Sequence, residues 1–337
     1  MADARPGTSI GLDFTDPALE SAVVATLGEV ENRLRITINS DDPLIAEAAR
    51  HLVDAGGKRF RPLLTAIAAQ FGAGGTREVV QSAVVVELTH LATLYHDDVM
   101  DEAEVRRGAP SANSRWGNSI AILVGDFLFA CAADVAAGLG VDAVRIQART
   151  FARLVHGQVA ETVGPRETDP VTHYLHVIAE KTGSLIATSA RFGAMYGGLP
   201  ADQVEALARY GEAMGTAFQL SDDVLDIASE SVQTGKTPGT DLREGVPTLP
   251  VLYALAAEEN DDSSVRLRDL LAAGPVTDDA RHAEALGLLR ESPALKRARE
   301  TVRVYAERAR AELAPLPDLA PRRALESLCD FIAERTG

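Results

Sequence analysis

Apolar and polar residues follow a helical period along most of this chain. Apolar positions recur three and four residues apart, whereas runs of alternating β-branched residues are scarce. Ala and Leu are abundant and aromatic residues make up only 5% of the chain, which favours helix over strand. The pattern predicts helices over Asp16–Asn39, Pro43–Ala55, Arg61–Phe71, Arg77–Asp101, Asn118–Leu139, Val141–Val163, Thr168–Met195, Ala201–Ser229, Leu249–Glu258, Ser263–Ala272, Asp278–Ser292, Pro293–Leu313 and Arg322–Glu334.

Local start and stop signals support these boundaries. Asp-Pro pairs at Asp42–Pro43 and Asp169–Pro170 are typical of helix starts, and glycine pairs such as Gly56-Gly57 separate the helices. The predicted loops are short, the composition is even, and no internal repeat is evident. We therefore predict one all-α domain over residues 1–337, with its core at about 40–335 and a flexible segment over 1–15.

The charge balance excludes some classes of function. The chain has 33 Lys and Arg against 49 Asp and Glu, a formal net charge of −16. This argues against nucleic-acid binding and against docking on anionic lipid, but a local basic cluster can still bind a small anion. Two cysteines, Cys131 and Cys329, cannot form a disulfide framework. With no signal peptide and no apolar run of the roughly 20 residues that span a bilayer, we expect a cytoplasmic protein without a transmembrane segment.

Two aspartate-rich turns carry the candidate chemistry. The pattern D-D-x-x-D occurs at 97–101 and again at 222–226, each time at the end of an apolar helical stretch. The first and last aspartates of each motif are four residues apart, so they share one helix face and repel each other where the helix dipole also disfavours anions. A solvated helix end could explain one such turn. Two matching turns favour Mg²⁺, which takes oxygen ligands and bridges carboxylates to phosphates.

Basic residues lie elsewhere in the chain. The segment GGKRFRP at 56–62 places three cations at the start of a helix, where exposed amides also bind anions. Arg106 and Arg107 follow the first aspartate motif, Lys181 interrupts a helix, and Lys236 lies in a glycine-rich loop. Each one alone is more often a surface charge. Together with two metal-type motifs they suggest sites for two diphosphates, one held by metal and one by Lys and Arg alone.

With these pieces in place, the sequence resembles the trans-isoprenyl diphosphate synthases, or polyprenyl synthetases, of the medium- and long-chain type. The resemblance covers roughly residues 40–335. It rests on GGKRFRP (56–62), ELTHLATLYHDDVMDEAEVRRG (87–108), the Lys181-Thr182 pair, FQLSDDVLD (218–226) and GKTPGTDLREGVPTLP (235–250), in the family's order and spacing. It implies an isoprenoid synthase helical bundle around a central cavity, and a homodimer.

The resemblance also implies a reaction and a role for each matching residue. An allylic diphosphate ionises, isopentenyl diphosphate attacks the cation, and a proton is lost. The residues that would hold Mg²⁺, three ions in the family, are Asp97, Asp101, Asp222 and Asp226, with Asp98 and Asp223 in support. Those matching the metal-free isopentenyl diphosphate site are Lys58, Arg61, His90 and Arg107. Those near the allylic diphosphate and the reacting carbons are Arg106, Lys181, Thr182, Gln219 and Lys236.

Product length is expected to depend on the helix that leads into the first motif. The growing chain would run along the face lined by Val86, Thr89, Ala92 and Thr93. Ala92 and Thr93 are small where short-chain members carry aromatic residues, so the resemblance implies a C30–C45 product, with C20–C25 as the alternative. Phe127 and Phe129 on the next helix would close the far end.

Other interpretations remain open at this point. A class I terpene cyclase shares the fold and one aspartate motif, but normally replaces the second motif and lacks GGKRFRP. A non-catalytic partner subunit tends to lose both motifs, and a binding bundle without chemistry would need neither. Glu87 and His90 form the E-x-x-H pattern of di-iron bundles, of which such a bundle needs two copies, and the chain has one.

Overall fold

The computed structural model describes residues 14–229, 238–259 and 261–336. Most of the described residues are helical, as the hydrophobic period predicts, and they include one two-stranded sheet. The helices fall into two compact units, of which the first comprises the described part of Met1–Arg153 together with Ser184–Gly211 and Glu312–Leu328. The second unit comprises Leu154–Gly183, the described parts of Glu212–Ala311, and the described end of the chain from Cys329. That the whole chain forms one domain stays a prediction.

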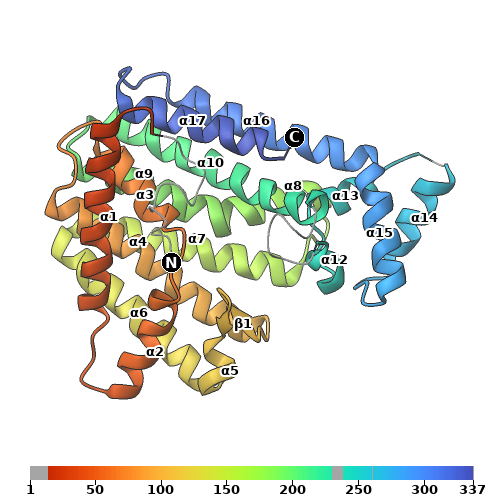
Figure 1. Ribbon diagram of the computed structural model, residues 1–337, viewed down its shortest axis with the longest axis horizontal. Coiled ribbons are helices and arrows are strands. Elements are labelled where there is room, and N and C mark those ends of the chain that lie inside the picture. Colours follow the sequence, from red (N-terminus) through yellow and green to blue (C-terminus); the bar gives the residue numbers. More distant parts are fainter. Residues whose placement is uncertain (1–13, 230–237, 260, 337) are drawn as a thin grey trace. The chain divides into compact units, whose positions relative to one another are not determined.

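The first unit is built around two helices, α3 and α4 (Figure 1). Helix α4 packs along α6 and also contacts α1 and α9, while α3 packs on α9. Gly125 of α6 permits the close approach to α4, because a Cβ there would lie 2.3 Å from His96 Nε2. The helices of this unit are α1 (Pro17–Thr37), α2 (Pro43–Asp54), α3 (Phe60–Ala69), α4 (Arg77–Met100), α5 (Ala112–Trp116), α6 (Asn118–Leu139) and α9 (Ser184–Tyr196).

The second unit is also helical. Its helices are α8 (Pro170–Ile178), α12 (Thr240–Glu244), α13 (Leu249–Leu255), α14 (Asp262–Ala272) and α15 (Asp279–Glu291). A π-helical turn at Ala179–Gly183 follows α8 directly. Four further helices contribute residues to both units: α7 (Val141–Val163), α10 (Ala201–Ala228), α16 (Pro293–Glu312) and α17 (Ala320–Glu334).

The predicted boundaries are confirmed to within a few residues for most helices, and the capping side chains explain why. The carboxylate of Asp42 accepts hydrogen bonds from the backbone N–H groups of Leu44 and Ile45 at 2.9 and 3.1 Å, and Asp169 caps α8 in the same way. The long helix predicted over Thr168–Met195 is wrong in its middle, where the π-helical turn separates α8 from α9. A π-helical turn inserts an extra residue into the helical repeat, and such turns are frequent at functional sites.

A short hairpin was missing from the prediction. Strands β1 (Val105–Arg106) and β2 (Ala109–Pro110) pair antiparallel directly after the first aspartate motif. Arg107 and Gly108 form its two-residue turn, both with left-handed backbone, φ 53° and 76°. Strands this short carry no detectable alternation of apolar and polar residues.

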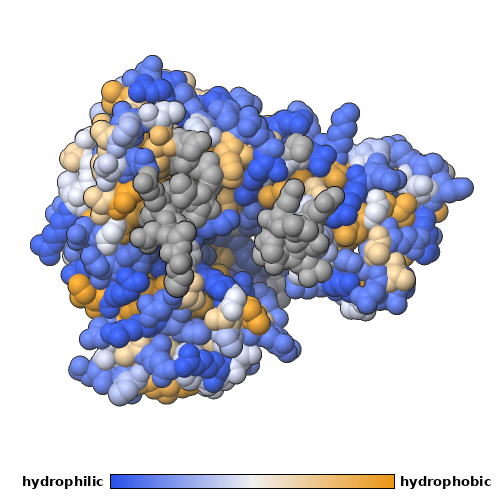
Figure 2. Space-filling model, in the orientation of Figure 1, coloured by the Kyte–Doolittle hydropathy of each residue, from blue (hydrophilic) through white to orange (hydrophobic). Residues whose placement is uncertain are grey.

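The hydrophilic surface and the free cysteines agree with the sequence composition, whereas one apolar helix qualifies an expectation. Hydrophilic residues predominate on the face drawn in Figure 2. Both cysteines are free, with Cys329 buried. Helix α6 is, by length and composition alone, apolar enough to cross a membrane, which qualifies the expectation that no segment would be. It carries Asp126 and Asp134, and one of its faces packs on α4.

Candidate active site

Three of the four residues predicted to bind isopentenyl diphosphate lie together in the first unit. His90 on α4 experiences the positive charges of Arg61 on α3 and Arg107 in the hairpin turn. Burial and these neighbouring charges lower the pKa of His90 well below its ordinary value, so the imidazole is neutral near pH 7. Lys58, the fourth, is exposed on the loop before α3. We call Arg59, Arg61, His90 and Arg107 the cationic cluster.

Arg107 is held on backbone carbonyls at the end of α2. Its Nη1 donates to Leu52 O at 2.8 Å and also to Gly56 O. Gly57 leaves the room for this side chain, because a Cβ at residue 57 would lie 3.0 Å from the Arg107 guanidinium carbon. The second glycine of GGKRFRP therefore admits an arginine from a distant hairpin, a reason for glycine that the sequence pattern alone does not reveal.

Arg61 is partly buried without a full set of partners. Its Nε is buried and makes no hydrogen bond. Burial lowers the pKa of Arg61 to about 10, the charge of Glu87 opposes this change, and the charge of Arg107 adds to it. A guanidinium group with unmet donors beside a second one is a natural site for a polyanion.

The first aspartate motif ends helix α4. Asp98 is fully buried, and its Oδ1 accepts a hydrogen bond from Arg106 Nε at 2.5 Å. Burial raises the pKa of Asp98, and the ion pair with Arg106 opposes this rise. Its Oδ2 is buried without a hydrogen-bond partner. Asp97 is half-buried and Asp101, which follows the last helical residue, is exposed.

The second aspartate motif lies on α10 in the second unit. Asp223 is 5% exposed and accepts hydrogen bonds from the Tyr174 phenol and, at 3.2 Å, from Gln219 Nε2. Burial raises its pKa well above the ordinary range, and the charges of Asp241 and Asp226 add to the rise. Asp226 accepts the backbone N–H groups of Thr240 and Asp241, each at 3.2 Å.

Asp222, in contrast, meets the end of the chain. Arg335, just past the end of α17, donates to Asp222 Oδ1 and to Ser221 Oγ, each at 2.5 Å. Its guanidinium lies over the Phe218 ring, 4.7 Å from the centroid. Neither Arg335 nor Tyr174 was predicted, since no local motif connects them to residues more than forty positions away.

Lys181 and Thr182 lie in the π-helical turn. Thr182 Oγ1 is 3.4 Å from Gln219 Oε1, so two residues predicted near the reacting carbons are neighbours. Lys181 forms an ion pair with Glu161 of α7, a partner that the sequence did not indicate. Lys236 lies outside the described residues.

The predicted product-length residues lie along α4. Val86, Thr89 and Ala92 are buried, and Thr93 is half-buried. Phe129 of α6 lies against His96 and Phe151, with ring centroids 5.6 and 4.3 Å apart.

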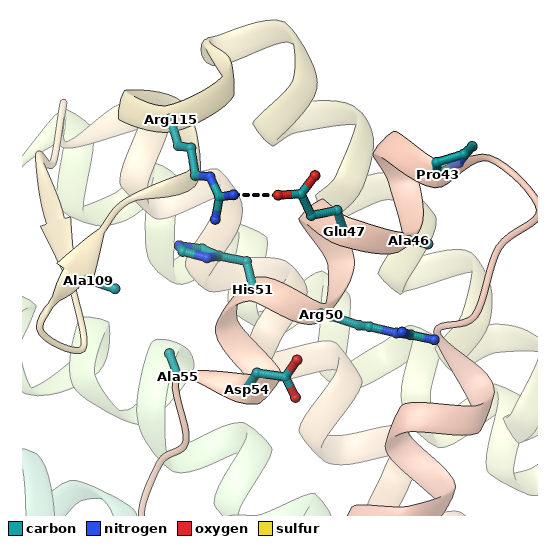
Figure 3. A pocket seen from close by; sticks show the side chains of 9 residues that line it. All are labelled: Pro43, Ala46, Glu47, Arg50, His51, Asp54, Ala55, Ala109 and Arg115. Atoms are coloured by element: carbon teal, nitrogen blue, oxygen red, sulfur yellow. Dashed lines mark hydrogen bonds and ion pairs between the residues drawn. The ribbon is translucent and has the colours of Figure 1, made fainter.

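A cavity of about 580 Å³ lies in the first unit but none of the predicted site residues lines it (Figure 3). Arg115 and Glu47 form an ion pair across it, and His51 Nε2 lies 2.7 Å from Pro110 O. The histidine thus links α2 to the hairpin that carries Arg106 and Arg107.

The residues present fit a divalent cation of the magnesium type. The candidate ligands are carboxylate oxygens one helical turn apart, which is the donor type that Mg²⁺ takes. Among the described residues, no group of three or more His, Cys, Asp or Glu side chains is arranged to hold a metal ion. Each motif would therefore leave coordination positions for water and substrate oxygens, as Mg²⁺ sites commonly do.

Comparison with known proteins gives consistent results. The family model of polyprenyl synthetases matches residues 42–288. The chain belongs to the polyprenyl synthetase family. It is 52% identical to a nonaprenyl diphosphate synthase of Mycobacterium tuberculosis over 335 residues, covering 98% of this chain and 99% of that one.

Solved structures of this family share the fold. A geranylgeranyl pyrophosphate synthase from Corynebacterium glutamicum, complexed with calcium and isoprenyl diphosphate, is 46% identical with a TM-score of 0.88, covering 97% of this chain and all of that one. A decaprenyl diphosphate synthase from Rhodobacter capsulatus is 35% identical with a TM-score of 0.84, covering 95% and 99%.

The predicted family, all-α isoprenoid synthase fold and enzyme class are thereby confirmed: the polyprenyl synthetase is a trans-prenyltransferase. Membership implies prenyl diphosphate substrates and a divalent metal ion, and it decides against the terpene cyclase and the di-iron bundle.

Proposed function

We propose that this polyprenyl synthetase condenses isopentenyl diphosphate with an allylic diphosphate, in a Mg²⁺-dependent reaction, to an all-trans polyprenyl diphosphate. The observation that carries the proposal is the cationic cluster, in which a buried Arg61 Nε without a partner lies beside Arg107 and a neutral His90. Such a cluster suits a diphosphate bound without metal. Lys58, Arg61, His90 and Arg107 would bind isopentenyl diphosphate.

The allylic diphosphate would be bound with Mg²⁺, three ions by resemblance, held by Asp97, Asp101, Asp222 and Asp226. The bound metal supplies Lewis-acid stabilisation of the departing diphosphate. Arg106, Lys181 and Lys236 add positive charge at the same group, which stabilises the transition state because charge develops there. Asp98 holds Arg106 by its ion pair. Asp223 holds the Gln219 amide, so that Gln219 and Thr182 present their oxygen dipoles together.

The condensation needs no oxidant, reductant or further substrate. The allylic C–O bond breaks and its electron pair leaves with the diphosphate. The double bond of isopentenyl diphosphate then forms the new C–C bond to the resulting cation. The released diphosphate accepts the proton lost from the isopentenyl unit, so no protein base is required.

Repeated addition gives the proposed C30–C45 product. The small side chains of Ala92 and Thr93 support a product longer than C20–C25, as does the similarity to a nonaprenyl diphosphate synthase. The similarity to a geranylgeranyl pyrophosphate synthase keeps C20 as the alternative.

We expect Ala92→Phe to shorten the product by one or more isoprene units, because the larger ring blocks the chain. Thin-layer or mass analysis of the products checks this, and an unchanged distribution would contradict the tunnel assignment.

A homodimer in the cytoplasm is part of the proposal. On α6, Ile122 and Leu123 are 42% and 61% exposed, and Val141 of α7 is 72% exposed. Exposed apolar side chains on neighbouring long helices support an interface between two copies. Light scattering of the purified protein distinguishes dimer from monomer.

The experiment that tests the two-site proposal is binding with and without metal. Isopentenyl diphosphate should bind in EDTA, and a non-reactive allylic diphosphate analogue should bind only when Mg²⁺ is added. Arg61→Gln should weaken the binding of isopentenyl diphosphate and leave the binding of the allylic analogue unchanged. Binding of both ligands without metal, or of neither with it, would refute the assignment.

A further inference from the structure

Glu87 lies within the cationic cluster, yet the proposed reaction gives it no part. Its side chain on α4 is 2% exposed, and its Oε1 accepts a hydrogen bond from Arg59 Nη1 at 2.9 Å. It shares an E-x-x-H pattern with His90, but no metal-binding group occurs among the described residues. A buried carboxylate needs another reason to be there, because removing its hydration is costly.

Arg59 is fixed by contacts on three sides. Besides Glu87 it binds Glu31 of α1 through Nε, and its Nη2 donates to Val53 O at 3.0 Å. Its backbone is left-handed, φ 49°, directly before the first residue of α3. Hydrogen bonds and charges from the two glutamates raise the pKa of Arg59 although burial acts against them. Arg59 is therefore fully engaged within the protein, and the anion site is left to its neighbours.

Those neighbours also experience the charge of Glu87. The carboxylate stabilises the charged forms of Arg61 and Arg107, both of which are disfavoured by burial. Arg61 and Arg107 repel each other. Without Glu87, the positive charges of Arg59, Arg61 and Arg107 would act on one another in a partly buried environment, with Glu31 bound to Arg59, and this is unfavourable.

We propose that Glu87 is the resident counter-ion of the isopentenyl diphosphate site: it balances the arginines in the empty protein and thereby limits how tightly the site binds diphosphate. This inference rests on the proposed function. Glu87 acts through the arginines and does not touch substrate, so it is a positioning and affinity-setting residue. Its removal makes the empty site less stable and the diphosphate-bound site relatively more stable.

A limit on affinity has a use in repeated condensation. The product of each round carries the diphosphate that entered with isopentenyl diphosphate. For the next round this group must leave the metal-free site and become the allylic diphosphate. A permanent negative charge beside the arginines shortens the time that the group stays bound.

The substitution that tests this is Glu87→Gln, which removes the charge but keeps an oxygen acceptor for Arg59. Thermal melting is measured in EDTA with and without isopentenyl diphosphate, so that only the metal-free site is occupied. We expect the ligand-free variant to melt several degrees below the wild type, and saturating isopentenyl diphosphate to close this gap. A purely structural role would leave the gap unchanged, and that result would overturn the inference.

Steady-state kinetics give a second readout. The KM for isopentenyl diphosphate should fall several-fold in Glu87→Gln, with the KM for the allylic substrate unchanged. A raised KM for isopentenyl diphosphate would overturn the inference. The matched control is Glu47→Gln on α2, which removes the exposed carboxylate paired with Arg115 (Figure 3) and should change neither quantity.

Should Glu87→Gln fail to fold, Glu31→Gln provides the test, because Glu31 is 29% exposed and contributes the second carboxylate to Arg59. Glu31→Gln should lower the melting temperature of the ligand-free protein and the KM for isopentenyl diphosphate, each by less than Glu87→Gln does. If the rise in melting temperature caused by isopentenyl diphosphate is the same as in the wild type, the inference is overturned. The proposed function fails separately: its site assignment is refuted if isopentenyl diphosphate does not stabilise the wild type. If isopentenyl diphosphate stabilises the wild type but the difference in melting temperature between wild type and Glu87→Gln persists, only the inference is refuted.

Discussion

The two aspartate motifs have the same D-D-x-x-D pattern but different surroundings. In both, the middle aspartate points into the protein, with Asp98 fully buried and Asp223 5% exposed. Asp98 meets the guanidinium of Arg106, whereas Asp223 meets a phenol and an amide. Burial raises the pKa of both carboxyl groups, but the charge of Arg106 opposes the rise at Asp98, whereas the charges of Asp241 and Asp226 add to it at Asp223. The same five-residue pattern therefore places its middle aspartates in different electrostatic surroundings.

The outer aspartates differ as well. Asp101 is exposed at the end of α4, whereas Asp226 accepts two backbone N–H groups at the start of α12. Asp222 is held by Arg335 from the end of the chain. The second motif is thus connected to segments that follow it by about 15 and more than 100 residues, and the first is connected to a hairpin only eight residues away.

The largest expected effect tests whether both motifs serve one reaction. Asp97→Ala and Asp222→Ala should each lower kcat by on the order of 10³-fold, because each removes a metal ligand from Lewis-acid stabilisation worth several kcal/mol. Steady-state rates at saturating substrate measure this, with circular dichroism as the control for folding. Full activity in either variant would show that its motif is not needed for the reaction.

A smaller effect separates the middle aspartates. Asp98→Asn should cost about 2 kcal/mol of the free energy of unfolding, because Arg106 loses its buried partner. Asp223→Asn should cost less than about 1 kcal/mol, since the side chain was bound by neutral groups and an amide can still bond to them. Denaturant unfolding measures both. Equal losses would contradict the difference in their surroundings.

The next prediction concerns the contact between Arg335 and Asp222 of the second motif. Arg335→Gln should lower the free energy of unfolding by about 1 kcal/mol, because charged hydrogen bonds to Asp222 and Ser221 are lost at a partly exposed position. Arg323→Gln on α17 is the matched control, since Arg323 forms an exposed pair with Asp318 and should change stability by less than about 0.5 kcal/mol. If the two variants were equally stable, Arg335 would be an ordinary surface residue.

The smallest effect concerns a residue that only the first motif has. His90 lies seven positions before Asp97, where the second motif has Gly215. The folded pKa of His90 is depressed, so below about pH 6.5 the unfolded chain takes up a proton that the folded protein does not. Between pH 7 and 5.5 the wild type should lose about 1 kcal/mol of stability more than His90→Gln. Parallel pH curves for the two proteins would show that His90 titrates normally.

Much of the fold could be predicted because it depends on local patterns. The helical period located Asn118–Leu139 and Val141–Val163 with their observed ends, and the Asp42-Pro43 pair located the start of α2. The π-helical turn at Ala179–Gly183 could be anticipated only as an interruption at Lys181, since the exact hydrogen-bond pattern depends on packing. The hairpin at 105–110 and the five-residue helices α5 and α12 are too short to leave a periodic signal.

The candidate site divides in the same way. The aspartates and arginines that match motifs could be named from sequence, and Arg61, His90 and Arg107 do lie within reach of one another's charges. Their partners could not be named, because Tyr174 contacts Asp223 and Arg335 contacts Asp222 only through the tertiary fold. Arg59 stands inside the GGKRFRP motif and was still missed, since its role depends on two glutamates 28 residues away on either side.

The most direct test of the central claim is one assay of the wild-type protein. Radiolabelled isopentenyl diphosphate is incubated with allylic primers from C5 to C20, with Mg²⁺ or with EDTA, and the products are separated by chain length. We predict incorporation that requires both primer and Mg²⁺ and ends at C30–C45. No incorporation with any primer in the presence of Mg²⁺ would contradict the account.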